Sequence, residues 1–442
     1  MTSPRRPAGR LLQVLGVAFG LAIVIGNTIG VGILRTPGDI ATRLPSVPWF
    51  LGVWVAGGVY ALLGALTLAE LGVAIPQSGG QYVFARRALG EYAGFAVGWG
   101  DWISSCAAGA LVTVTLGEYS DVLVPAVHGH AAKVAIGVML LLTAIQARGI
   151  RAGDLTQQIT TLLKMLVLLG LAGVCLVFAP GTPAASAATA STPAPVWLPG
   201  FGALVLACQG VIYTYDGWNG LLYFGGEVKN PGRDIPRSMA GGVLGVIAVY
   251  LLLNIAFLRV LPLSSMAGET LVAAAAAKAI FGPNGDTVVR GVILLSLLSG
   301  ANAILLIGSR LPYALSRDGL LSPVMGRVNQ GGTPVPSLLA STAATIVLIV
   351  SGTFNQILAL AAFFYVVLYT VSFVAVFILR RREPDLPRPY RAIGYPWITG
   401  FLMLGSLGFL VGSLLSDTRN SLFSIALLMA SRPVYRLVKG KT

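Results

Sequence analysis

The stretch Gly26–Pro37, GNTIGVGILRTP, decides the fold, because it places three glycines, an asparagine and a threonine inside an apolar run. The preceding residues, LLQVLGVAFGLAIVI, have the composition of the first half of a membrane-spanning helix. A backbone that opens at bilayer depth leaves N–H and C=O groups without water, at several kcal/mol each. The glycines therefore either let helices pack closely or mark a helix that is broken for a purpose.

The composition indicates a polytopic helical membrane protein. Of the 442 residues, 55% are hydrophobic and 10% are charged, and the mean hydropathy is +0.81, whereas soluble domains carry about 25% charged residues. Apolar segments of about 20 residues recur along the chain, each long enough to cross a hydrocarbon core of ~30 Å. The predicted fold class is all-α, with twelve transmembrane helices. They span residues 11–42, 49–75, 91–123, 132–150, 154–179, 200–228, 238–261, 287–316, 336–353, 355–380, 393–416 and 418–437.

The basic residues behind the net charge of +14 are distributed according to membrane topology, so they do not indicate nucleic-acid binding. With the N-terminus inside, the predicted cytoplasmic segments hold 22 of the 30 basic residues, Arg310 among them, and the external segments hold six. Arg35 and Lys164 lie within spans. The positive-inside rule then predicts that both termini are cytoplasmic. We expect a multi-pass protein of the cytoplasmic membrane, in contact with lipid and without a nucleic-acid partner.

Residues 1–442 are predicted to form a single transmembrane domain. No small-residue cleavage site follows the Arg-rich start, so we expect the first segment to stay as a span. The uncharged loop 180–199 is a Pro/Ala/Ser/Thr spacer, and the Ala-rich segment 264–281 is expected to form a short helix over the outer face. Residues 11–180 form a first set of five helices, and residues 200–380 form a second set of opposite topology. Helices 11 and 12, at 393–437, lie outside this repeat.

A second interruption, YTYDGWNGLLYFGG at Tyr213–Gly226, occupies the sixth span, which corresponds to the first span of the other half. Paired broken helices in inverted halves indicate the binding site of a secondary transporter. In the first break, free N–H groups around Val31 and Gly32 would hold a carboxylate. Free carbonyls at residues 25–28 would hold an ammonium group. The glycines keep side chains away from the ligand.

The side chains of the second break are the next candidates. Asp216 either caps the second half-helix or faces water and a ligand, because an ionised carboxylate in a span needs a partner. Tyr213 is predicted to be a lid over the ligand and Tyr215 is a weaker candidate, since either could be an ordinary packing residue. Asn219 could exchange hydrogen bonds with the ligand.

Lys164 lies about 15 Å into the fifth span, at the limit of what snorkelling reaches. We therefore expect it to face the interior, as a fixed positive charge beside the first break. Glu70 and Glu118 lie near span ends, where their side chains can reach the interface. Asp101 is deeper and has no assigned partner.

Several chemistries lack the residues that they need. No metal-ligand cluster, phosphate-binding loop or nucleophile–base pair is present in the sequence. We therefore expect no metal, no cofactor, no direct drive by ATP and no enzymatic activity. The three cysteines all fall inside predicted spans, so no disulfide framework is indicated.

The chain resembles the amino acid–polyamine–organocation (APC) permeases, and within them the L-type amino acid transporter branch and its bacterial relatives. GNTIGVGILRTP is similar to the helix 1 motif of that family, AELGVAIPQSGGQY to its signature after helix 2, and YTYDGWN with EVKNPGRDIP to its helix 6 motif. The likeness continues through SRLPYALSRDGLLSP and RRREPDLPRPYR, so that it covers nearly the whole chain.

The resemblance implies a fold like that of LeuT, with a 5+5 inverted repeat, broken helices 1 and 6 and alternating access. It implies that the amino acid carboxylate meets Gly30, Val31 and Gly32, and that the amino group meets Thr28 and the segment 213–216. Tyr213 matches the gating aromatic residue. Lys164 matches a helix 5 lysine that replaces the second sodium ion of sodium-coupled relatives.

Two departures from the family pattern are visible. Val31 stands where the family usually has Ser or Thr, which removes a hydroxyl contact, and Tyr213 replaces the commoner Phe. No external cysteine could bond a glycoprotein partner, so we expect no such subunit and a monomer or weak homodimer.

The sequence hypothesis is a sodium-independent permease or exchanger of amino acids, with neutral ones favoured. A polyamine or cationic amino acid carrier with Asp216 as counter-ion is the alternative. A channel or a nutrient sensor built on a transporter scaffold is a remoter one.

Overall fold

A computed structural model describes residues 11–30, 32–44, 46–178, 199–269, 271–282, 285–351, 354–416 and 418–439. Within these residues the chain is helical, apart from turns and two isolated bridges, Leu15 with Val228 and Ser78 with Phe224. The predicted all-α class is therefore confirmed for the part of the chain that the structure describes.

The helices follow the predicted segments closely. In the first half they are α1 (Val17–Thr28), α2 (Gly32–Arg43), α3 (Val47–Ala74), α4 (Gln81–Leu89), α5 (Glu91–Leu123), α6 (Ala131–Ala147) and α7 (Ile150–Val177). In the second half they are α8 (Phe201–Tyr215), α9 (Pro231–Val260), α10 (Leu263–Met266), α11 (Val272–Phe281), α12 (Gly285–Arg317), α13 (Val335–Ser351), α14 (Phe354–Arg382), α15 (Trp397–Ser416), α16 (Thr418–Met429) and α17 (Ser431–Lys439). Short 3-10 turns η2 (Gly220–Tyr223) and η3 (Gly225–Glu227) follow α8.

Six of the described helices are long and apolar enough to cross a membrane. They are residues Val47–Ala74, Ile150–Val177, Pro231–Val260, Ile293–Arg317, Phe363–Arg382 and Trp397–Ser416. Together with the apolar composition, these helices make the chain a multi-pass membrane protein. The count of twelve spans stays a prediction, and so does the inverted repeat.

The described structure differs from two of the sequence predictions. The segment 264–281 forms two short helices, α10 and α11, because the chain turns between them at Gly268, whose φ is +83°. The predicted last span divides into α16 and α17, each far shorter than a bilayer is thick. The predicted loop 180–199 lies almost wholly outside the described residues.

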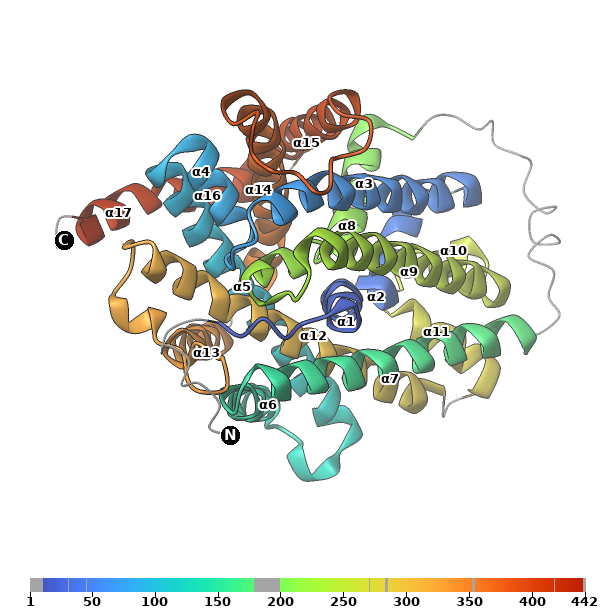
Figure 1. Ribbon diagram of the computed structural model, residues 1–442. Coiled ribbons are helices and arrows are strands. Elements are labelled where there is room, and N and C mark those ends of the chain that lie inside the picture. Colours follow the sequence, from blue (N-terminus) through green and yellow to red (C-terminus); the bar gives the residue numbers. More distant parts are fainter. Residues whose placement is uncertain are drawn as a thin grey trace.

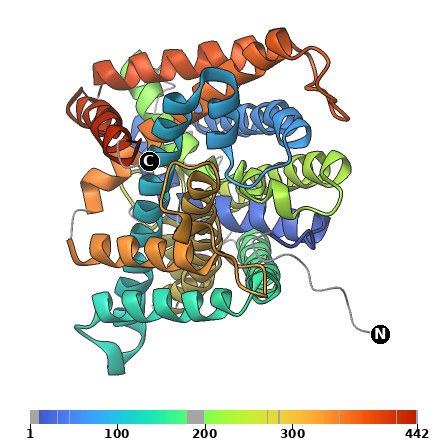
Figure 2. The ribbon, with the colours of Figure 1, turned by 60° about the vertical axis from the view of Figure 1, so that its left-hand side comes forward.

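The helix α1 occupies the centre of the bundle, where Figure 1 shows it almost end-on among α7, α9 and α12. The helices α3, α9 and α7 run side by side around it. In the turned view of Figure 2, α5 and α12 stand next to each other. Both breaks of the chain therefore lie inside a wall of long helices.

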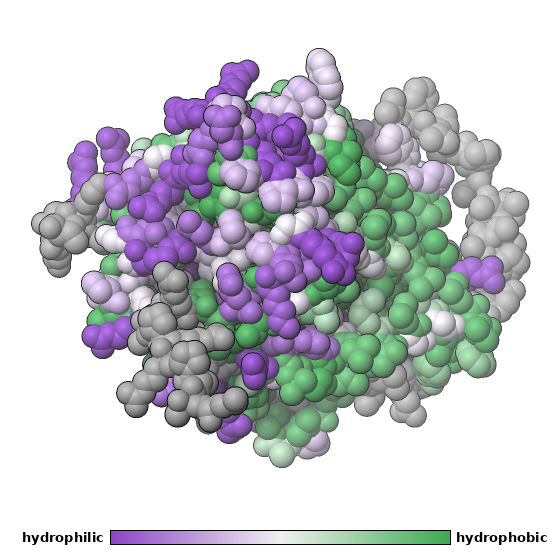
Figure 3. Space-filling model, in the orientation of Figure 1, coloured by the Kyte–Doolittle hydropathy of each residue, from purple (hydrophilic) through white to green (hydrophobic). Residues whose placement is uncertain are grey.

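The surface carries an apolar area that suits contact with lipid chains. Leu155, Leu162 and Leu166 of α7 are each about 60% exposed, and Trp397 and Phe401 of α15 are more exposed still. Figure 3 shows apolar side chains over the part of the face where α7 and α9 run, and hydrophilic ones over the opposite part. Exposed leucines along a long helix are costly in water but favourable in a bilayer.

Candidate functional site

The first helix breaks where the sequence predicts. The helix α1 ends at Thr28, Ile29 has an extended ψ of 101°, and α2 begins at Gly32. Val31 lies outside the described residues. A helix end leaves carbonyls without intrahelical partners, and a helix start leaves N–H groups without them. The break therefore presents acceptors from α1 and donors from α2.

Lys164 of α7 reaches the acceptor side of this break. Its Nζ donates to the carbonyl of Gly26 at 2.9 Å and also to the carbonyl of Ile29, and its side chain is 1% exposed. Ser296 Oγ of α12 lies 3.5 Å from the same Ile29 oxygen. The interior location expected for Lys164 is confirmed. A Cβ at Gly26 would lie 1.9 Å from Gln157 Nε2 and 2.6 Å from Thr161 Oγ1, so a larger residue here would displace both side chains.

The second helix also breaks as predicted, but its continuation differs. The helix α8 ends at Tyr215, Asp216 is extended with ψ of 149°, and Gly217 has φ of +109°. The chain then continues through turns, η2 and η3, instead of the α-helix that the sequence hypothesis placed there. Asp216 thus follows the end of α8 and caps no second half-helix.

The two breaks touch each other. A Cβ at Gly217 would lie 2.9 Å from the Thr28 backbone nitrogen, and Asn27 Nδ2 donates to the Gly217 carbonyl at 3.3 Å. The hydroxyl of Tyr250, which is fully buried on α9, lies 2.8 Å from both the Thr28 and the Thr214 carbonyl oxygens. One hydroxyl therefore joins the ends of both half-helices and fixes the spacing of their carbonyls.

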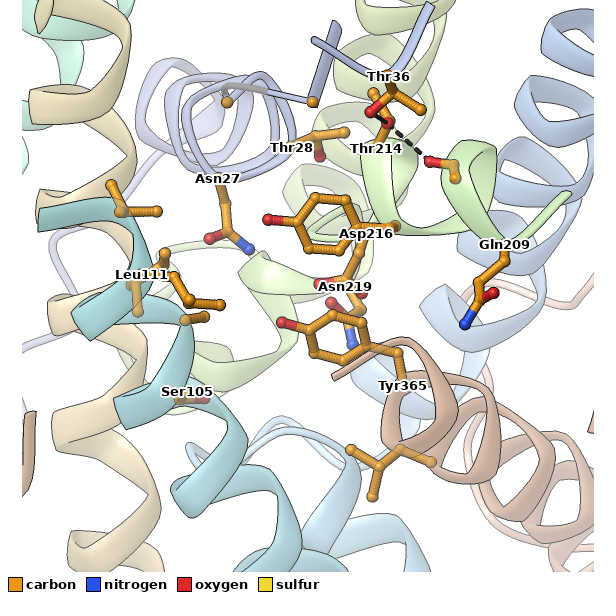
Figure 4. Close-up of a pocket in the computed structure, with 18 of the residues that line it drawn as sticks. Asn27, Thr28, Thr36, Ser105, Leu111, Gln209, Thr214, Asp216, Asn219 and Tyr365 are labelled. Carbon is orange, nitrogen blue, oxygen red and sulfur yellow. Dashed lines mark hydrogen bonds between the residues drawn. The ribbon is translucent and has the colours of Figure 1, made fainter. Parts of the chain in front are cut away.

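A cavity of about 520 Å³ lies at the two breaks. Six of the predicted site residues line it, namely Thr28, Gly30, Gly32, Tyr213, Asp216 and Asn219. In Figure 4 the α1 residues Asn27 and Thr28 face Asp216 and Asn219 across the cavity. Tyr365 enters from α14, and Ser105 with Leu111 lies along α5. The Oγ1 atom of Thr28 is buried and makes no hydrogen bond within the described structure.

Tyr215 lies away from this cavity, and its predicted contact with a ligand is not supported. Its ring packs on Tyr250 at 4.9 Å and on Trp54 at 6.2 Å between centroids, and its side chain is 2% exposed. Successive helical residues are about 100° apart. Two residues apart, Tyr213 and Tyr215 therefore face nearly opposite sides of α8.

Asp216 is held by tyrosines of α14. The hydroxyls of Tyr365 and Tyr369 and the N–H of Gly217 all donate hydrogen bonds to its carboxylate. These donors satisfy a carboxylate that the end of α8 brings into the interior.

Two further polar residues line the same cavity: Asp101, which the sequence showed in a span without a role, and Gln81, which no sequence pattern indicated. Asp101 of α5 is 4% exposed and accepts a hydrogen bond of 2.7 Å from Tyr223 of η2. Gln81, at the start of α4, is 1% exposed, and neither its amide nitrogen nor its amide oxygen has a partner within the described structure. The available signal was the charge of Asp101 deep in a predicted span.

The comparisons with known proteins agree with this geometry. The family model described as "Amino acid permease" matches residues 13–430. The chain is an amino acid permease of the APC superfamily. It is 29% identical to the serine/threonine exchanger SteT of Bacillus subtilis, over 98% of both chains. It is 28% identical to the human large neutral amino acids transporter small subunit 2 (97% of this chain, 80% of that protein), and 27% identical to the mouse b(0,+)-type amino acid transporter 1 (86% and 79%). These relatives are transporters and not enzymes.

The permease contains two ion pairs with fully buried carboxylates, and the sequence did not indicate either pairing. Arg310 of α12, counted as cytoplasmic, is fully buried and binds Glu227 of η3 through two hydrogen bonds of 3.0 and 2.9 Å. Glu70 of α3, which was expected to reach the interface, is 0% exposed. It accepts hydrogen bonds from Arg380 and from the N–H of Ala392. Each carboxylate is buried because a charged partner reaches it.

The permease also carries a charged cluster at the end of α12. Tyr82 Oη and Arg86 each approach Asp318 Oδ2 at 2.9 Å, and Arg317 lies 3.0 Å from its Oδ1. Burial alone would raise the pKa of Asp318, but the hydrogen bonds from Arg317 and Tyr82 and the charge of Arg86 outweigh it and lower the pKa. The cluster joins α4 to the end of α12.

Proposed function

We propose that this permease is a sodium-independent secondary transporter that moves amino acids across the cytoplasmic membrane by alternating access. One observation carries the proposal: the two broken helices touch and open onto one cavity. Donors at the start of α2 and acceptors at the ends of α1 and α8 are complementary to the carboxylate and the ammonium of an amino acid.

The predicted site residues other than Tyr215 each have a place in this arrangement. The N–H groups of Gly30, Val31 and Gly32 bind the carboxylate, and glycine lets it approach the backbone. The carbonyls at Thr28 and along 213–216 bind the ammonium group. Tyr213, which lines the cavity, closes over the substrate as a lid, and Asn219 hydrogen-bonds to the substrate.

Lys164 supports the sodium-independent part of the proposal. Its ammonium group donates to carbonyls at the end of α1. In a sodium-coupled transporter, a sodium ion would be bound by such carbonyls instead. A fixed cation in this position removes the need for a bound one. The remaining drive is exchange for another amino acid or coupling to protons.

We also propose the twelve-span topology, with cytoplasmic termini and a 5+5 inverted repeat. In that repeat, α3 corresponds to α9, α5 to α12, and α6 to α13. The members of each of these pairs pack directly against each other, as do α2 and α8. Contact between equivalent helices supports a two-fold axis through the bundle centre, near α1.

The permease is proposed to work as a monomer or weak homodimer, without a glycoprotein subunit. Its cysteines, Cys106, Cys175 and Cys208, all lie in helices and are free thiols. No cysteine is therefore available outside the bundle for a disulfide to a partner.

Neutral amino acids are the first candidate substrates, because one relative is a serine/threonine exchanger and another is a large neutral amino acids transporter. Cationic amino acids are the second candidate, which the carboxylates of Asp101 and Asp216 in the cavity favour.

Counterflow in proteoliposomes tests the proposal. Purified permease, reconstituted alone in sodium-free buffer and loaded with unlabelled serine or alanine, should accumulate the labelled amino acid with saturable kinetics. Flux that does not saturate would indicate a channel. Binding without any flux would indicate a sensor. A strict requirement for sodium would contradict the role of Lys164, and displacement by putrescine would contradict recognition of the carboxylate.

A further inference from the structure

Asp101, Tyr223 and Gln81 form a polar corner of the cavity. None of them takes part in the proposed binding of the amino acid's carboxylate and ammonium groups. All three residues line the cavity. A Cβ at Gly80 would lie 2.5 Å from the Tyr223 ring, so the glycine before Gln81 brings the start of α4 against this ring. Tyr223 in turn donates to Asp101 Oδ2 at 2.7 Å. The corner is thus a built part of the cavity.

The two carboxylates of the cavity differ in how well they are satisfied. Asp216 receives three hydrogen bonds, from Tyr365, Tyr369 and the N–H of Gly217. Within the described residues, the Asp101 carboxylate receives one side-chain hydrogen bond, from Tyr223. A carboxylate has about four acceptor positions. Asp101 therefore keeps capacity for a donor from the cavity, whereas Asp216 is largely occupied by the protein.

The charge around Asp101 is also unbalanced. Among the described side chains that line the cavity, the basic one is Arg43, which is exposed at the far end of α2, about 16 Å along that helix from Gly32. Asp101 is 4% exposed and forms no ion pair within the described structure. A buried carboxylate is stabilised when a cation pairs with it. The unpartnered amide of Gln81 supplies a second acceptor in the same corner.

We propose that Asp101, Gln81 and Tyr223 form a side-chain subsite for the terminal ammonium or guanidinium group of a dibasic amino acid. The inference rests on the proposed binding of an amino acid at the two helix breaks. It assigns the residues that would let the permease bind cationic substrates as well as neutral ones. The head group donates to the free oxygen of Asp101 and to Gln81 Oε1, while Tyr223 holds the other carboxylate oxygen. Asp101, rather than Asp216, is then the specificity-determining carboxylate.

The test compares arginine with citrulline, its neutral counterpart of nearly the same shape, as competitors of labelled serine counterflow. Wild-type permease should be inhibited by arginine at a concentration at least about tenfold lower than by citrulline, the usual range for a charged hydrogen bond. Asp101→Asn should remove this preference. Asp101→Glu retains the charge but extends the side chain, so it should shift the preference from arginine to the shorter ornithine.

The control is Glu118→Gln, an exposed carboxylate farther along the same helix α5, which should leave the arginine preference unchanged. Equal inhibition by citrulline and arginine in wild-type permease would overturn the subsite. The proposed function would still hold in that case, because serine counterflow would still be observed. Loss of the preference in Asp216→Asn but not in Asp101→Asn would overturn the assignment to Asp101. Absence of any amino acid counterflow would instead overturn the proposed function.

Discussion

Replacing Lys164 with Met tests how the first break is held. Methionine keeps the length of the buried stem but removes the ammonium group, so the carbonyls of Gly26 and Ile29 both lose their hydrogen bond from Nζ. A hydrogen bond from a charged donor contributes about 1.5–3 kcal/mol. A free-energy change of about 1.4 kcal/mol corresponds to a tenfold change in an equilibrium constant or a rate. The loss of even one such bond from the transport-competent arrangement therefore lowers the transport rate by about 10- to 150-fold.

The thermal stability of the same variant should change much less. Removing a fully buried charge also removes its desolvation cost, which offsets part of the lost hydrogen bonding. We therefore expect sodium-free serine counterflow to fall at least tenfold, while the melting temperature in detergent stays within a few degrees. Lys278→Met, at an exposed lysine of α11, is the matched control and should transport normally. Undiminished counterflow in Lys164→Met would refute the role of the lysine.

Three further predictions follow from other contacts. Gly32→Val should weaken serine binding at least tenfold in a competition assay, because a Cβ at this position would lie 2.8 Å from Thr214 Oγ1 and Gly32 lines the cavity at the proposed carboxylate site. Wild-type affinity would exclude the proposed contact. Glu227→Ala should lower the free energy of unfolding by about 3–5 kcal/mol, because it leaves Arg310 as a buried unpaired charge. Adding Arg310→Met should recover much of this loss. A double variant as unstable as Glu227→Ala would contradict the prediction. Because the folded-state pKa of Asp318 is lowered, its contribution to stability is present above its ordinary pKa of about 4 and is lost as the pH falls below that value. Melting temperatures of wild type and Asp318→Asn should accordingly differ at pH 7 and converge below about pH 4, and a constant difference would count against the cluster.

Both helix breaks could be predicted from the sequence because glycines and polar residues inside an apolar span have few other uses. The interior position of Lys164 followed from its depth alone. What happens after the second break did not follow, because the turns at 216–219 and the 3-10 segments depend on contact with Asn27 and Thr28 in the other break. Tertiary contacts of this kind leave no local pattern in one sequence.

The side chains around the cavity were harder to predict. Tyr215 could have been excluded by helical periodicity, which turns it away from Tyr213. Asp101 and Glu70 were visible as charges in spans, but their partners, Tyr223 and Arg380, lie far along the chain. A charged residue near a span end suggests snorkelling, and only the packing of distant helices shows that it is buried with a partner.

The central claim is that the two broken helices recognise both charged groups of one amino acid. Competition of serine counterflow by two truncated analogues tests it most directly: ethanolamine lacks the carboxylate, and 3-hydroxypropionate lacks the amino group. Because each group would meet its own set of backbone partners, we predict that serine inhibits and that neither analogue does so at a hundredfold higher concentration. Inhibition by either analogue at the concentration at which serine inhibits would contradict the claim.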